Sequence, residues 1–398
     1  MTAGTSIPDA GHRDPVLVVA RALHPPWNEG TRVVARSVGI LAAERRGVHA
    51  ISLTRPEFLV ESDPELPVER VVARSAYGAV GDYRDLPAVA RAVRRAVDEH
   101  RYAAAHIISL PLPLALLLRR SGIPVIVHAT LGTHVYATRL DRARNAAARV
   151  FDRFVDAYAC SSESILEELV LAGHDRRRLH VLAPPLDTTH FQKRDRATAR
   201  EVLGLPADAF LVVYVGTVSP ARFPAETIAG AVRRAAASVP GLHLEAFAPV
   251  RTHGYNVEWA QENVGRAAAA AGISARVRLE DLDAERKALA YSAADVVLLP
   301  FTGPVAVEPP LTLQEAAACE ANLLVSPHAN RSAIVTDTTG DIYDGSEEGL
   351  ASALVEIADR SGAERVLRGR TARDEVTRRY GAEASAAALE QVWDAVGA

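Results

Sequence analysis

The sequence predicts an α/β protein made of two Rossmann-like, doubly wound parallel-sheet domains. Its 398 residues exceed what one hydrophobic core normally holds, and 48% of them are apolar. Apolar strand-like runs alternate with amphipathic helical runs along the chain, which is typical of parallel strands joined by crossover helices. A segment without strands, residues 183–208, separates two such series. We expect the domains to face each other across a cleft, with ligands at the carboxyl ends of the strands.

The first series starts with an apolar strand at residues 15–20. A helix is expected at residues 31–46, because Val34, Val38 and Leu41 recur on one helical face before Gly47. The remaining elements expected in this series are strands at 48–53, 105–109, 124–128 and 157–161, and helices at 86–100, 112–121, 136–154 and 162–172.

The second series starts with FLVVYV at residues 210–215, followed by Gly216. Its other expected strands are 242–247, 276–279, 296–299 and 323–325, and its expected helices are 224–238, 259–271, 284–292 and 312–319. We therefore predict domains at residues 1–190 and 191–375, and a C-terminal helix at 376–398 that packs back on the first domain.

Composition excludes several classes of protein. The net charge of -4, from 45 basic and 49 acidic residues, gives no basic field for nucleic acid. Two separated cysteines, Cys160 and Cys319, and a polar N-terminus predict a cytoplasmic protein. Residues 103–118 are too short and too interrupted to span a bilayer. Only Lys193 and Lys287 are lysines, and this scarcity indicates a GC-rich bacterial genome.

The first strand–helix connection, LHPPWNEGT, lacks the G-x-G-x-x-G pattern of dinucleotide-binding folds. Gly30 opens the helix, either as a simple cap or to give an anionic group access to the helix N-terminus. His24 and Trp27 lie in the same loop and are candidates for contact with a second substrate.

In the second domain, Gly216 ends a strand and a short loop carries Thr217 and Arg222 toward the next helix. An arginine at this place could hold a diphosphate with two parallel hydrogen bonds, or it could be a surface residue. Thr312 and Glu315 have capping-box spacing, which gives Glu315 a structural explanation. The functional alternative is a phosphate at the helix N-terminus, a ribose hydroxyl on Glu315, and a polar ligand near Glu308.

These pieces, in this order, resemble the retaining family-4 glycosyltransferases with the GT-B fold, from about Val16 to Tyr380. The segments that carry the resemblance are NEGTRVVARSVGILAAERRGVHAISLT, DAYACSSESILEELVLAGHDRRRLHVLAPPLDTTHF, YVGTVSPARFP, SAADVVLLPF and LTLQEAAACEANLLVSP. The resemblance implies an enzyme that moves a sugar from a nucleotide-diphosphate sugar to an acceptor, retaining configuration and needing neither metal nor cofactor.

The resemblance also implies roles for individual residues. Glu315 would bind the nucleotide ribose and Arg222 the diphosphate, as a catalytic group. The implied donor-binding set is Gly30, Gly216, Thr217, Arg222, Glu308, Leu311, Thr312 and Glu315.

Five positions depart from the family pattern. Val307 stands where the family has its first Glu, and Glu308 follows one residue later. Thr217 stands where the family has an Arg, and Arg222 where it has a Lys. Glu320 and Asn322 replace the Gly and Pro that follow the helix, so we expect the turn there to differ.

On the acceptor side, His128 at a strand end and His134 six residues later are both candidates for the family's histidine. We choose His128 as catalytic, because strand ends hold residues rigidly, and assign His134, His24 and Trp27 to the acceptor. The acceptor is a small molecule or a glycolipid. Peripheral membrane contact stays open, because five arginines in the helix expected at 136–154 form either a solvated face or an anion-binding one.

Two other functions remain as alternatives. One is a catalytically altered GT-B protein that binds nucleotide sugar without transferring it, and the other is a nucleotide-sugar epimerase. A pyridoxal phosphate phosphorylase is disfavoured, because neither lysine is expected at the pocket.

Overall fold

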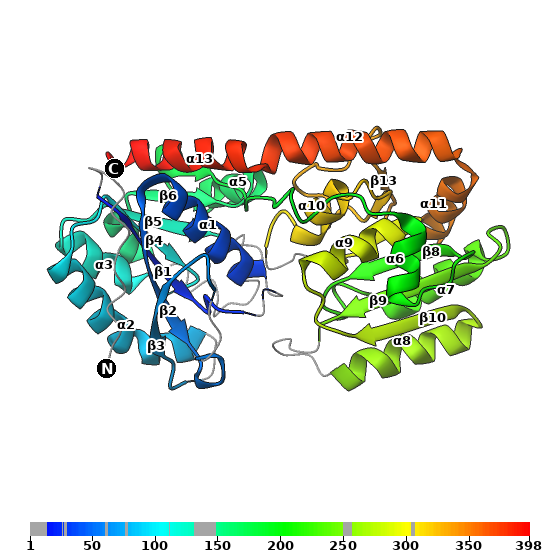
Figure 1. Ribbon diagram of the computed structural model, residues 1–398, viewed down its shortest axis with the longest axis horizontal. Coiled ribbons are helices and arrows are strands. Elements are labelled where there is room, and N and C mark those ends of the chain that lie inside the picture. The colour runs from blue at the N-terminus through cyan, green and yellow to red at the C-terminus, as the bar shows by residue number, and fades with distance from the viewer. Residues whose placement is uncertain are drawn as a thin grey trace. The chain divides into compact units, whose positions relative to one another are not determined.

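The computed structural model describes residues 14–25, 27, 30–59, 63–75, 79–110, 112–130, 149–249, 257–303 and 307–398. The chain forms two compact units (Figure 1). Unit 1 comprises Met1–Pro185 together with Ala382–Ala398, and unit 2 comprises Leu186–Gly381. The last helix therefore belongs to the same unit as the first strand.

Unit 1 contains a seven-stranded parallel sheet with the order β3–β2–β1–β4–β5–β6–β7. Its strands are β1 Val16–Arg21, β2 Val48–Thr54, β3 Val68–Val72, β4 Ala104–Ile108, β5 Val125–Ala129, β6 Ala157–Cys160 and β7 Leu179–Val181. Its helices are α1 Gly30–Arg46, α2 Ala79–Glu99, α3 Pro113–Arg120, α5 Glu163–Leu171 and α13 Ala382–Ala395, with short 3-10 helices at Pro56–Phe58, Arg149–Phe154 and Arg176–Arg178.

The central strands β1 and β4 of unit 1 are almost fully buried, because helices cover both faces of the sheet. Successive side chains of a strand point to opposite faces. On β1, Leu17 and Val19 belong to a core shared with Val93 of α2 and Leu118 of α3. This packing places the connections that carry polar residues at the carboxyl ends of the strands.

Unit 2 contains a six-stranded parallel sheet with the order β10–β9–β8–β11–β12–β13. Its strands are β8 Phe210–Val215, β9 Leu242–Ala248, β10 Ser274–Leu279, β11 Val296–Leu299, β12 Leu323–Val325 and β13 Asp341–Ile342. Its helices are α6 Arg196–Leu203, α7 Ala225–Ala235, α8 Val257–Ala271, α9 Ala284–Ala293, α10 Leu311–Ala318, α11 Glu347–Asp359 and α12 Gly362–Tyr380.

The helices of unit 2 form two packed groups. One is α7 with α8 and α11, and the other is α9 with α6 and α10, with α12 packed on α10. Counted in chain order from β8, the strands run 3-2-1-4-5-6 across the sheet, which is the Rossmann order. The predicted fold class, two Rossmann-like parallel-sheet domains, is therefore confirmed.

The predicted linker at residues 183–208 is wrong in one respect, because it contains α6. Asp195 caps this helix and Gly204 ends it in the left-handed conformation, with φ of 58°. Arg200 of α6 is 3% exposed and pairs with Asp295 at 2.8 Å. The helix is thus part of the fold of unit 2. Of the helix predicted at 136–154, residues 136–148 lie outside the described residues, and Arg149–Phe154 is a 3-10 helix.

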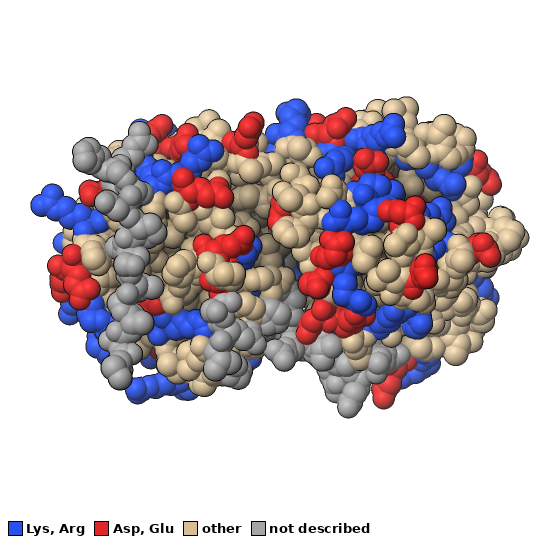
Figure 2. All heavy atoms as spheres, in the orientation of Figure 1, with Lys and Arg blue, Asp and Glu red and all other residues tan. Residues whose placement is uncertain are grey.

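Acidic and basic side chains are interspersed over the face of the molecule drawn in Figure 2. This pattern spreads the near-balanced charge of the sequence over both units. Within the described ranges, every helix is too short or too polar to cross a bilayer.

Candidate active site

The predicted donor-binding residues of unit 2 gather where the sheet changes winding direction. Strands β8 and β11 are neighbours, with Val212 opposite Val296. The helix after β8 packs with α8, whereas the helix after β11 packs with α9 and α12. At such a switch point the two connections diverge and leave a crevice at the carboxyl ends of the strands. The loop after β8 carries Gly216, Thr217 and Arg222, and the loop after β11 leads to Glu308 and α10.

Gly216 has a backbone conformation that disfavours side chains. Its φ is +148°, and a Cβ atom there would lie 3.1 Å from the Tyr214 hydroxyl. That hydroxyl donates to the carbonyl of Thr217 over 2.7 Å, which fixes the start of the loop. Burial raises the pKa of Tyr214, so it remains a neutral donor. The loop is therefore held in one conformation before any ligand binds.

Arg222 lies in a tight turn of the same loop, where its N–H donates to the carbonyl of Ser219 over 3.0 Å. Its side chain is half-buried. Its positive charge acts on Tyr214, where it partly opposes the rise in pKa that burial causes. No ion pair or side-chain hydrogen bond engages its guanidinium in the described part of the chain. The arginine thus presents unused donors at the carboxyl end of β8.

The N-terminus of α10 lies beside this loop. Pro310 is its N-cap residue and supplies no side-chain acceptor. The Thr312 hydroxyl donates to the carbonyl of Val215, the last residue of β8, over 3.3 Å. Half-buried Leu311 and Thr312 thus begin the helix next to Gly216. A helix N-terminus favours negative charge because its first N–H groups lack partners within the helix.

The capping-box explanation of Glu315 is wrong, because Pro310 and not Thr312 caps the helix. The Glu315 side chain instead points to α9, where Tyr291 donates to Oε2 over 2.8 Å and the Lys287 ammonium lies 3.3 Å from Oε1. Lys287 is thus a site residue that the sequence analysis placed away from the pocket. Its four-residue spacing from Tyr291, which puts both on one face of a helix, was the available signal.

Glu308 is 3% exposed, and the Ser332 hydroxyl donates to its carboxylate. Val307, at the position of the family's first Glu, is buried. Glu320 does take the left-handed conformation after α10, with φ of 56°. The turn that a glycine forms in the family is therefore made here by a glutamate.

In unit 1, His24 follows β1 and is fully buried, stacked on Phe58 at 4.3 Å between ring centroids. Burial, together with Arg32 and other nearby arginines, lowers its pKa to about 4. The half-buried Trp27 ring lies 5.3 Å from the guanidinium carbon of Arg36. Gly30 is the first residue of α1.

His128 lies near the end of β5 and is 4% exposed. Its Nε2 lies 3.2 Å from the Ser161 hydroxyl, and burial lowers its pKa to about 4. It is therefore neutral at pH 7. His134 lies outside the described residues. Among the described residues, no group of three or more His, Cys, Asp or Glu side chains is placed to hold a metal ion.

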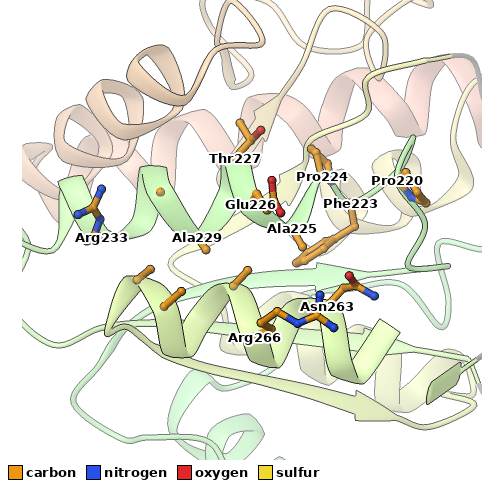
Figure 3. Close-up of a pocket in the computed structure, with 14 residues that line it drawn as sticks. Pro220, Phe223, Pro224, Ala225, Glu226, Thr227, Ala229, Arg233, Asn263 and Arg266 are labelled. Carbon is orange, nitrogen blue, oxygen red and sulfur yellow. The ribbon is translucent and has the colours of Figure 1, made fainter. Parts of the chain in front are cut away.

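A separate hollow of about 600 Å³ lies between α7 and α8 (Figure 3). Pro220, Phe223 and Pro224 line it on the side of the β8 loop, and Arg233 and Arg266 come from the two helices. None of the predicted site residues lines it, although Phe223 directly follows Arg222.

Comparison with known proteins agrees with these features. Residues 31–190 match the model of Glycosyltransferase Family 4. The D-inositol 3-phosphate glycosyltransferase of Mycolicibacterium smegmatis is 31% identical over 216 residues, which are 52% of this chain and 46% of that one. The Mycobacterium tuberculosis enzyme of the same name (strain F11) is 32% identical over 185 residues, 45% of this chain and 35% of that one. The match thus spans less than half the length of these relatives.

Solved structures extend the likeness to both units. Sucrose-phosphate synthase from Thermosynechococcus elongatus superposes with a TM-score of 0.75 at 19% identity, covering 96% of this chain and 98% of that one. HepE from Anabaena, in complex with UDP and glucose, gives a TM-score of 0.73 at 14% identity, covering 97% and 100%. The segment that matches the family model is therefore part of a GT-B fold.

Proposed function

We propose that the protein is a glycosyltransferase that moves a sugar from a nucleotide-diphosphate sugar to an acceptor. The observation that carries the proposal is the meeting of the Gly216 loop, the unengaged Arg222 and the α10 N-terminus at the switch point of unit 2. A diphosphate is the ligand that such a combination favours, because arginine and helix N-termini both bind phosphate oxygens.

In this proposal Arg222 and the first turn of α10 hold the diphosphate, Glu315 the ribose and Glu308 the sugar. Positive charge at the departing diphosphate stabilises the transition state, so Arg222 and the helix N-terminus take the place of a metal ion. If configuration is retained, a departing phosphate oxygen accepts the acceptor's proton on the same face of the sugar. Positioning, rather than a pair of carboxylates, then supplies most of the rate enhancement.

The acceptor is assigned to unit 1, near His24, Trp27 and His128. A small phosphorylated acceptor is supported by the relatives, which are named for inositol 3-phosphate. A cytoplasmic location is supported by the two free, buried cysteines, which suit a reducing compartment.

The test is a thermal-shift screen of UDP-, GDP-, ADP- and dTDP-sugars, followed by product analysis with and without an acceptor panel that begins with inositol 3-phosphate. We expect one nucleotide to raise Tm, because a ligand that binds only the folded state stabilises it. Sugar transfer to the acceptor supports the proposal. Epimerisation of the donor would instead favour the nucleotide-sugar epimerase. Tight binding without any transfer would favour the catalytically altered GT-B protein. Failure of every nucleoside diphosphate to bind overturns it.

A further inference from the structure

One side-chain cluster of unit 2 has a composition that the family resemblance does not explain. Lys287 and Tyr291 lie one turn apart on α9, and both contact Glu315 of α10. The Glu315 side chain is 7% exposed and that of Lys287 is 18% exposed. A nearly buried carboxylate thus receives one donor on each of its two oxygens.

The donor on Oε1 is a lysine in a chain that otherwise uses arginine. Lys193 and Lys287 are the only lysines among 45 basic residues. An arginine would engage a carboxylate with two parallel N–H groups and so occupy both oxygens, whereas a lysine acts as a point charge on one. Lysine at this position therefore leaves Oε2 to Tyr291.

The remaining acceptor capacity of the carboxylate can be counted. An ionised carboxylate offers about four lone-pair sites, two on each oxygen. Lys287 and Tyr291 use one site on each oxygen. Among the described residues, one site on each oxygen has no partner, and two adjacent acceptors match the two hydroxyl donors of a vicinal diol. The N-terminus of α10, where the diphosphate is proposed to bind, lies one turn before Glu315, and Thr312 in its first turn contacts Val215, which precedes Gly216.

We propose that Lys287 is a positioning residue: with Tyr291 it fixes the Glu315 carboxylate so that its two open lone-pair sites accept the 2′ and 3′ hydroxyls of the donor's ribose. This inference rests on the proposed function, because it needs a nucleotide at the switch point. Lys287 does not touch the reacting atoms. Its effect reaches the nucleotide through Glu315.

The test compares a ribonucleotide with its deoxy analogue. Lys287→Met keeps an unbranched side chain one atom shorter and removes its charge, and Tyr291→Phe keeps the ring and removes its hydroxyl. Arg286→Met is the matched control, because Arg286 is the neighbouring cation on α9 and pairs with Glu280 instead. Affinities for UDP and 2′,3′-dideoxy-UDP are measured by titration calorimetry. GDP or ADP and its dideoxy analogue replace them if the screen selects another base.

We expect Lys287→Met to weaken binding of the ribonucleotide by about tenfold and that of the dideoxy analogue by less than twofold. Tyr291→Phe should show the same selectivity, and Arg286→Met should change neither affinity. An equal loss of affinity for both ligands, or no loss for either, would overturn the inference about Lys287. The proposed function would still stand in that case, provided that the wild type binds UDP. If the wild type binds no nucleoside diphosphate, the proposed function fails first. If Lys287→Met does not fold, Tyr291→Phe decides the question by the same comparison.

Discussion

The indole Nε1 of Trp393 donates a hydrogen bond to Nε2 of His106 over 3.0 Å, which joins α13 to β4, the middle strand of the unit 1 sheet. Trp393 is fully buried, and the guanidinium carbon of Arg46 on α1 lies 5.1 Å from its ring. Burial, and next the neighbouring His128, lowers the pKa of His106 to about 3. The imidazole is therefore neutral and accepts at Nε2.

Trp393→Phe should destabilise unit 1. Within the described residues, the change removes the hydrogen-bond donor to Nε2 of the fully buried His106 and leaves a cavity beside β4. These losses together amount to about 2–4 kcal/mol. Urea unfolding followed by circular dichroism measures the change, with Glu390→Gln on the exposed side of α13 as the control. A loss below about 0.5 kcal/mol would show that the hydrogen bond contributes little.

Acidification should destabilise the protein partly through His128. Its pKa in the folded protein is about 4, below the ordinary value of 6.5, so between these values the unfolded chain binds a proton that the folded one does not. This contribution to stability is complete above pH 6.5 and is lost as the pH falls toward 4. Between pH 7.5 and pH 5 it should amount to about 1–2 kcal/mol.

His128→Gln removes the titrating group and keeps a polar atom near Ser161. The difference in free energy of unfolding between pH 7.5 and pH 5 should therefore be smaller in the variant than in the wild type. Equal differences in the two proteins would mean that His128 stays accessible to protons when folded.

Arg222→Ala should abolish tight binding of a nucleoside diphosphate and leave stability nearly unchanged. The guanidinium has no hydrogen-bonded partner within the described residues, so its removal breaks no hydrogen bond or ion pair among them. A loss of charge-assisted hydrogen bonds to phosphate is expected to weaken affinity at least tenfold. Calorimetric titration with UDP, GDP and ADP measures this loss. Arg233→Ala on α7 is the control, and an unchanged affinity in Arg222→Ala would remove the arginine from the site.

Glu320→Gly should stabilise unit 2. Glu320 has a φ of 56°, a conformation that costs a residue with a Cβ atom about 1 kcal/mol relative to glycine. The change gives up a 4.0 Å contact with the largely exposed Arg370, which contributes little, and a favourable charge interaction with Lys193, which makes the net gain smaller. The midpoint of urea unfolding should rise. Ala318→Gly, inside α10, should lower it, and the prediction is wrong if both variants shift in the same direction.

The fold could be predicted from the sequence because its central strands, such as β1 and β8, are continuous apolar runs. The edge strand β3 was missed, since its half-buried residues include Glu69 and Arg70, and β13 has only two residues. The α6 helix was missed because its amphipathic pattern lies among prolines and charges in the predicted linker.

Some residues of the candidate site were predicted together with their position in the fold, because neighbouring residues in the sequence determine that position. Gly216 and Arg222 follow a strand directly, so their place at its carboxyl end follows from the order of elements. The pairing of Glu315 with Lys287 and Tyr291 depends on how α9 packs against α10, which no spacing within either helix reveals. The local signal at Glu315 was misleading because Pro310 caps the helix.

The membership of α13 in unit 1 determines how the molecule can be dissected. Residues 186–381 form one uninterrupted stretch, so a gene fragment with these limits encodes all of unit 2. A fragment that stops at residue 185 encodes a first unit without Trp393, and its middle strand then lacks the indole that covers His106. Isolation of unit 1 therefore calls for a circular permutation that joins residues 382–398 to residue 14.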